Sequence, residues 1–581
     1  MKYKSLVLAL CLVWSLNGMT ACQPPERKGT VVVPNTSMDQ RMRVLLSKQA
    51  GAPVDSSFQP PFVADNMLSS GLRANALRYG AVRQVPAGPG LVDLLVDVQW
   101  DGSWRNPHNW DAAWTFVKFR APDGRWKHAS LAPQGHVLSP LAGTAPTPAG
   151  AWTWAPDSTG LWLHRAAASS PGPNRWTARL RWAAGADGAA AGAEVRVLGL
   201  EMVYVPEGAF YAGDGVSVAA FEGAGGEPVR IDSTGTVVTS FEFREQPSFS
   251  DGVLGGEGVY VDGDGGINTA GAAARIDNAG YPTGYEAFYV GKYELTQGQY
   301  ATFLTLLTPE QRAVRNISLE TPDPNAEIPR DNTYSYVDYR GAIACDESGC
   351  RAQYPNRAVS YIGWPDGTAF MDWAGLRPMT ELEYEKAARG DQPPIAGEYA
   401  WGSTYIAKSK NVLDPASGEL ATDGLEQASG EVTDGNASFG SLFRRGGAGK
   451  AGPLRVGIFS ETAQGYRQAA GASYYGAMEL SGNVSEQTVS LDQHEGRQFQ
   501  GTHGDGDLGD LGFATNSDWP GREAKGTIVR GGAWYFDADE LRISDRTYMN
   551  NEILGRGYLD GIRGARSAPE PSQRSTGRGS P

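Results

Sequence analysis

The chain has 581 residues, a formal net charge of -14 at pH 7, 41% hydrophobic residues and 20% charged residues. This length is enough for two or three domains with a large core. The acidic balance argues against nucleic acid as a partner, because phosphate binding needs a basic surface. Six histidines spread along the chain argue against a multi-histidine metal site.

The first 21 residues have the organisation of an export signal. Lys2 and Lys4 supply positive charge, Leu6 to Leu16 is apolar, and residues 19–22 read Met-Thr-Ala-Cys. The apolar run is too short for a membrane span. Because cysteine follows the small-residue cleavage site, the segment resembles a bacterial lipobox, which implies removal of residues 1–21 and a lipid on Cys22. An ordinary signal peptide is the alternative.

A lipid on Cys22 would anchor the mature protein in the cell envelope, and we expect the outer membrane, on its periplasmic or surface side. Residues 22–75 are polar and contain prolines. We interpret them as a lipidated tether that lets the folded part stand clear of the bilayer.

Residues 76–198 are predicted to form an all-β, sandwich-like domain. Leu91–Trp100 and Ala113–Arg120 place apolar residues at roughly every second position, which is the period of a half-buried strand. The loop Trp104–Asp111 is dense in aromatic and polar groups. It either binds a ligand or packs its aromatic rings within a turn.

Residues 199–566 combine short strands with short helices. Thr296 and Thr380 are predicted helix N-caps, and Glu383 completes a capping box with Thr380. A glycine-rich insertion, residues 214–285, contains the acidic pentapeptide 262–266. That pentapeptide fits a surface turn better than a calcium loop, because it lacks the closing glutamate of an EF-hand.

The C-terminal part contains a series of phrases in a fixed order. They are Leu376–Glu385, Leu480–Glu486, Val529–Trp534 and Gly561–Arg566. Together with the strand phrases at 201–210, 288–296 and 358–366, they resemble the formylglycine-generating enzyme, or sulfatase-modifying factor, family. The resemblance implies an α+β domain of C-type-lectin-like topology with little regular secondary structure. The tail, residues 567–581, is predicted to be disordered.

The resemblance also shows what this chain lacks. In the family, two thiolates five positions apart follow the Arg-Gly-Gly strand, bind Cu(I) and carry out the oxidation. Counted from Arg530, these positions fall at Phe536 and Leu541, and no cysteine lies between Trp534 and Arg566. Because neither side chain can bind copper or act as a nucleophile, we expect no copper and assign no catalytic residue.

Calcium is the cofactor that the resemblance implies, as one or two structural ions. The first site would use carbonyl oxygens of Ser481, Gly482 and Val484 and the carboxylate of Glu486. The second would use Asn411, Val412, Asp423 and Leu425. The alternative is that both phrases persist as turns without metal.

The family's peptide-substrate groove has candidate counterparts here. They are Trp534, Tyr535, Arg542, Asp545, Arg546, Tyr548 and Asn550. Such groups can hold a peptide, a glycan or a carboxylate in a concave site, or they can pack and pair within the core. His503 stands beside acidic residues, and we expect a solvated loop there rather than a metal site.

The remaining cysteines, Cys345 and Cys350, flank an acidic loop. Export favours a disulfide between them over a redox role. The sequence therefore favours a lipid-anchored, non-catalytic envelope protein that binds a protein or peptide partner. A formylglycine-generating oxidase and a calcium-dependent glycan-binding module are the alternatives.

Overall fold

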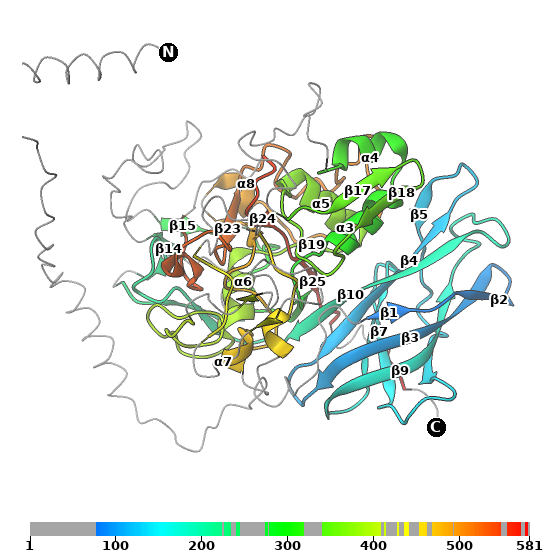
Figure 1. Ribbon diagram of the computed structural model, residues 1–581, viewed down its shortest axis with the longest axis horizontal. Helices are drawn as coiled ribbons and strands as arrows, with labels where there is room; N and C mark the ends of the chain where they lie inside the picture. The colour runs from blue at the N-terminus through cyan, green and yellow to red at the C-terminus, as the bar shows by residue number, and fades with distance from the viewer. Residues whose placement is uncertain are drawn as a thin grey trace, which may run out of the picture. The chain divides into compact units, whose positions relative to one another are not determined.

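The two halves of the chain meet in a large antiparallel sheet, which Figure 1 shows. The computed structural model describes residues 77–223, 226–233, 240–243, 273–276, 278–318, 340–407, 412–413, 427–428, 435–440, 452–461, 467–491, 493–547, 555–570 and 576–578. The predicted signal, Cys22, the tether and the acidic pentapeptide lie outside these residues. Within them, no helix is both long enough and apolar enough to cross a membrane.

The first sheet is built from the N-terminal part of the chain. Its central strands are β3 (Leu91–Arg105) and β9 (Ser169–Trp182), flanked by β1 (Arg78–Tyr79), β2 (Arg83–Gly88) and β6 (Val137–Pro140). All their pairings are antiparallel. In β3, buried residues alternate with more exposed ones between Leu94 and Trp100, as the sequence predicted.

The second sheet runs through both halves of the chain. Its order is β19 (Arg377–Pro378), β25 (Gly564–Ser567), β16 (Phe288–Gly291), β10 (Val195–Val205), β4 (Asp111–Arg120), β8 (Leu161–Arg165), β7 (Gly150–Trp154) and β26 (Thr576–Arg578), with β5 (Trp126–His128) on β4. One apolar core contains side chains of both sheets, including Trp100, Trp176, Trp182, Phe119 and Leu163. The first sheet and the N-terminal strands of the second sheet therefore share one apolar core.

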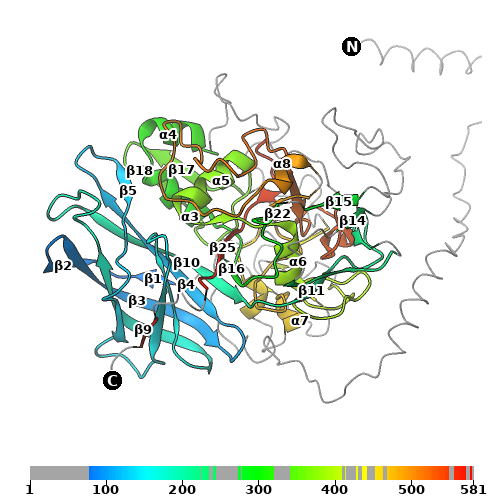
Figure 2. The same cartoon turned by 180° about the vertical axis from the view of Figure 1, so that it is seen from behind.

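Strand β10 joins the N-terminal strands to residues 199–566, called the family part below, and Figure 2 shows it beside β4 and β16. Along Val195–Val203 it pairs with β4, and along Met202–Val205 it pairs with β16. The boundary expected between residues 198 and 199 thus falls inside one strand. Buried Lys292 also reaches across, since its Nζ lies 2.9 Å from an oxygen of buried Asp111.

The family part is mixed α+β, with more strands than helices, as predicted. Its helices are α3 (Gln297–Thr305), α4 (Pro309–Arg315), α5 (Trp364–Trp373), α6 (Glu381–Arg389), α7 (Arg467–Ala470) and α8 (His494–Arg497), with 3-10 turns η3 (Ile458–Glu461) and η4 (Ala538–Leu541). Strand β22 (Ser485–Val489) pairs with β23 (Thr527–Arg530) and β24 (Asp560–Gly561). The other small ladders join β11 (Phe210–Ala212) to β13 (Val229–Ile231), β12 (Phe221–Glu222) to β14 (Ser240–Phe243) and β15 (Ala273–Arg275), β17 (Ile343–Asp346) to β18 (Gly349–Ala352), and β20 (Val412–Leu413) to β21 (Gln427–Ala428).

Local predictions about helix ends are confirmed. The Thr296 and Thr380 side chains accept hydrogen bonds from the Gln299 and Glu383 amides, and Glu383 closes its capping box. The loop at 104–111 follows the packing interpretation, because Trp104 and Trp110 are buried and Trp110 stacks on Tyr204 at 4.0 Å between ring centroids.

The C-terminal segment differs from the expectation of a disordered tail in the part that the structure describes. Ser567 is the last residue of β25, residues 568–570 continue from it, and the Ala568 amide donates to the Ala287 carbonyl. Further on, β26 pairs with β7. Edge strands present unpaired amides and carbonyls, so the C-terminus supplies partners to the edge of the second sheet.

Candidate functional site

The turn after the Arg-Gly-Gly strand depends on its two glycines. Strand β23 ends at Arg530, and both Gly531 and Gly532 have positive φ, 83° and 65°. A Cβ on Gly531 would lie 2.8 Å from Glu486 Oε2 and 2.9 Å from the Leu480 carbonyl oxygen. Only glycine fits both the left-handed conformation and the close approach.

The positions of the family's two thiols lie in an apolar cluster. Leu541 is fully buried and packs with Tyr399, Trp401 and Ala437, and Phe536 packs against the same cluster. Tyr399 stacks on Trp401 with 4.9 Å between ring centroids. The site therefore offers a copper ion no soft ligand from these two positions.

The arginine of the Arg-Gly-Gly strand belongs to a buried ionic network. Arg530 is fully buried, and its guanidinium lies 3.2 Å from Glu381 and 2.9 Å from Glu385. Glu385 also pairs with Arg389 at 3.0 Å. Nearby guanidinium groups hold the pKa of the Glu385 carboxyl below its ordinary value despite its burial. This network fixes α6 to β23, a structural role.

The predicted groove residues divide between core and surface. Trp534, Asp545 and Arg546 are buried, and Arg546 donates from Nε and Nη2 to Glu381 at 2.7 and 3.0 Å. The structure thus places Arg546 in the core and not on an open wall. Tyr535 and Arg542 are half-buried. Tyr548 and Asn550 lie outside the described residues.

Two buried carboxylate oxygens, one in the predicted first calcium site and one just before it in the sequence, have no hydrogen-bond partner in the described residues. Arg563 donates to Glu486 Oε1 from Nη2 at 2.8 Å and from Nε at 3.2 Å, while Glu486 Oε2 has no hydrogen-bond partner. Glu479 Oε2 is buried and equally without one. Burial raises the pKa of each carboxyl to about 7, against the opposing charge of Arg563.

These donors fit a hard cation in part. A carboxylate oxygen left orphaned in the interior is costly and suits a metal, but Glu486 would have to share its charge with Arg563. Sequence reasoning missed Glu479 and also Glu294, whose carboxylate accepts from Asn483 Nδ2 and the Val484 amide. Both side chains are buried. Their burial depends on contacts between distant parts of the chain, so the sequence offers no signal for either residue.

The second calcium site is not described beyond one strand. Asn411, Asp423 and Leu425 lie outside the described residues, and Val412 is placed only as backbone in β20. Among the residues that the structure does describe, no group of three or more histidine, cysteine, aspartate or glutamate side chains could hold a metal ion.

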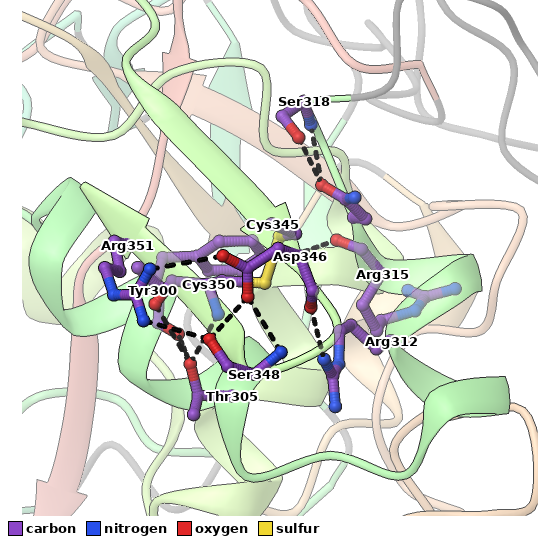
Figure 3. The surroundings of a disulfide bond; sticks show 12 residues. Tyr300, Thr305, Arg312, Arg315, Ser318, Cys345, Asp346, Ser348, Cys350 and Arg351 are labelled. Carbon is purple, nitrogen blue, oxygen red and sulfur yellow. Dashed lines mark hydrogen bonds and ion pairs between the residues drawn. A yellow bond between two sulfur atoms is a disulfide. The ribbon is translucent and has the colours of Figure 1, made fainter. Parts of the chain in front are cut away.

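Two further predictions concern Cys345, Cys350 and His503. The disulfide is confirmed: it links paired residues of the β17–β18 hairpin, and the Cys350 amide donates to Thr305 Oγ1 of α3 at 2.8 Å (Figure 3). The loop around His503 is partly exposed, at Thr502 and Asp505, and the His503 side chain itself is 22% exposed. Its Nε2 accepts from the Ser567 amide at 3.0 Å, and burial and the charge of Arg566 lower its pKa to about 3.

Comparison with known proteins agrees with this arrangement. A family model described as "Sulfatase-modifying factor enzyme 1-like domain" matches residues 256–568. A protein of Streptomyces coelicolor named formylglycine-generating enzyme is 30% identical over 165 residues, which cover 26% of this chain and 48% of the relative. One of the same name from Thermomonospora curvata is 39% identical over 136 residues, which cover 21% of this chain and 44% of the relative.

The chain spans about half the length of these curated relatives. The family match, in contrast, covers more than half of the chain itself, and it includes the Arg-Gly-Gly turn and the phrase around Glu486. The chain belongs to the formylglycine-generating enzyme, or sulfatase-modifying factor, family.

Proposed function

We propose that this protein is a non-catalytic member of its family that binds a protein or peptide partner in the cell envelope. In this proposal the lipid on Cys22 anchors it, at the outer membrane, and the membrane is its second contact. Its N-terminal sheets act as a β-sandwich, and its family part keeps a lectin-like topology for binding.

One observation supports the loss of catalysis most directly. The side chains at the two thiol positions are phenylalanine and leucine, and Leu541 is fully buried against Tyr399 and Trp401. Copper-dependent oxidation needs soft ligands at both positions. The only cysteine pair in the described residues, Cys345 with Cys350, is oxidised and belongs to the β17–β18 hairpin.

Cu(I) titration and an oxygen-uptake assay test the proposal. The full chain is incubated with Cu(I) and a cysteine-bearing sulfatase-type peptide, and we expect neither stoichiometric copper binding nor oxygen consumption. The double variant F536C/L541C is the positive control, and it should gain a Cu(I) site. Peptide oxidation by the unaltered chain would refute a non-catalytic role and establish the oxidase.

A calcium-dependent binding module, with glycan as the ligand, is the second candidate. It is supported by the orphaned oxygens of Glu479 and Glu486. If calcium binds there, those carboxylates would hold it, and the ion would tie the loop 479–486 to β22. Calcium should then raise the melting temperature of the wild type but not of E486Q. Glycan-array binding that a chelator abolishes would favour this candidate over a peptide-binding role.

A further inference from the structure

A ligand-sized cavity lies away from the thiol positions, between residues that are far apart in the sequence. Its volume is about 330 Å³, at the lower end of the usual range for small-ligand sites. Its walls come from the ends of β10 and β16, from the loop 278–287, and from residues 567–570 at the end of β25 and after it. Sequence reasoning did not find it, because its lining comes from segments that are far apart in the sequence, between Tyr204 and Glu570.

Three carboxylates around this cavity form no ion pair with a cationic side chain among the described residues. Glu207, Glu286 and Glu570 all line it and are solvent-exposed. In the part of the chain that the structure describes, none of the three carboxylates forms a hydrogen bond or an ion pair. They are close enough to act on one another, since burial and then the charges of Glu207 and Glu570 raise the pKa of Glu286, against the opposing charge of Lys386.

The cationic side chains near the cavity are already engaged. Arg377, which lines it, donates to both oxygens of Glu383 at 2.6 and 2.8 Å. Lys386 lies behind the wall, where its Nζ donates to the carbonyls of Gly284 and Tyr285. The charge of Lys386 acts on Glu207 and Glu286 from behind the wall, but one cation faces three carboxylates. The rim therefore keeps an excess of negative charge, which favours a cationic occupant.

We propose that this cavity binds a basic side chain, lysine or arginine, of a partner polypeptide. The inference rests on the proposed binding function and adds the chemistry of the partner. Phe288, Pro282, Ala287 and Pro569 line the cavity beside the carboxylates. Such walls suit an aliphatic stem, while the acidic rim receives the charged head, as long basic side chains require. A metal ion is the poorer occupant, because the described residues around this cavity include no group of three or more histidine, cysteine, aspartate or glutamate side chains that could hold one.

Calorimetric titration with small probes tests the inference on the full chain. The probes are Nα-acetyl-lysine methylamide and Nα-acetyl-arginine methylamide, with Nα-acetyl-norleucine methylamide as the neutral analogue. The basic probes should bind at one site with a dissociation constant on the order of 1 mM, which is usual for ligands of this size. The neutral analogue should not bind, and added salt should weaken the basic probes.

Two triple variants separate the cavity from the overall charge. E207Q/E286Q/E570Q should weaken basic probes about tenfold. E347Q/E495Q/E523Q makes the same change in net charge at three other glutamates and should leave binding unchanged. Equal weakening of probe binding in both variants would overturn the inference. So would the absence of saturable binding to the wild type at a probe concentration about tenfold above the expected dissociation constant.

The outcomes are independent of those that test catalysis. Failure of the probes to bind would remove the cavity inference and leave the non-catalytic role untouched. Oxidation of a cysteine-bearing peptide would refute the non-catalytic role and leave probe binding as measured. If only free amines such as agmatine bind and the blocked amino-acid probes do not, the cavity takes a small cation and the polypeptide partner is refuted.

Discussion

Methionine in place of Arg546 tests whether this residue belongs to the core or to a binding groove. The variant removes a buried guanidinium and keeps an unbranched chain. It deletes the bonds to Glu381 at 2.7 and 3.0 Å and one to the Ala219 carbonyl at 3.2 Å. Glu381 keeps Arg530 and the Leu491 amide as partners.

The partners that Glu381 keeps determine how much free energy of unfolding the variant should lose. Breaking a buried ion pair from one side costs about 3–5 kcal/mol, and we expect about 3 kcal/mol because Glu381 is not left alone. The entropy of unfolding is roughly 2 cal/mol/K per residue, or about 0.8 kcal/mol/K for the roughly 400 residues that the structure describes. The melting temperature should therefore fall by about 4 °C.

Arg542 provides the matched control, since the sequence placed both arginines in the same groove. Its partner Asp539 is 75% exposed, and an exposed pair contributes under about 1 kcal/mol. R542M should therefore melt within about 1 °C of the wild type. Intrinsic tryptophan fluorescence during a thermal ramp measures both variants. If R546M also melts within that range, the core assignment of Arg546 is wrong.

Three other predictions concern titration, the disulfide and the domain boundary. Burial lowers the pKa of Lys118 from 10.5 to about 7, so between these values only the unfolded chain holds the proton and stability rises with pH. K118M should therefore melt at a higher temperature than the wild type at pH 6, and this difference should disappear by pH 10. A difference in melting temperature that does not change with pH would contradict the lowered pKa of Lys118. The double variant C345S/C350S should melt about 2 °C lower, because so short a loop contributes about 2 kcal/mol; an unchanged melting temperature would mean that the staple adds no stability. A fragment of residues 199–566 lacks the β4 partner of β10 and should give no cooperative transition by circular dichroism, whereas a cooperative transition would restore the boundary at 198.

The sequence could predict what depends on neighbours along the chain. The caps at Thr296 and Thr380 and the hairpin disulfide follow from rules that act within a few residues, and all three are confirmed. The family could be predicted because its phrases are short and ordered. Residue spacing could not show that Arg546 pairs with Glu381, because these residues are 165 positions apart. Residue spacing also could not show that β10 pairs with both β4 and β16, because these strands are far apart in the sequence.

The position of Leu541 shows how the scaffold can persist without its thiols. The Leu541 carbonyl accepts from Ser481 Oγ at 2.7 Å, which holds the backbone of η4 against the loop that leads to Glu486. The Leu541 side chain adds apolar burial at the same point. Backbone placement and side-chain chemistry are therefore separable here: a cysteine at 541 would cost about 2–3 kcal/mol in lost packing but would leave the Ser481 bond intact. Because the buried Arg530 network does not include either thiol position, we expect F536C/L541C to fold. That is the reason this variant can serve as a positive control for copper binding, and its gain of a site would show that two side chains, and not the fold, separate this chain from copper chemistry.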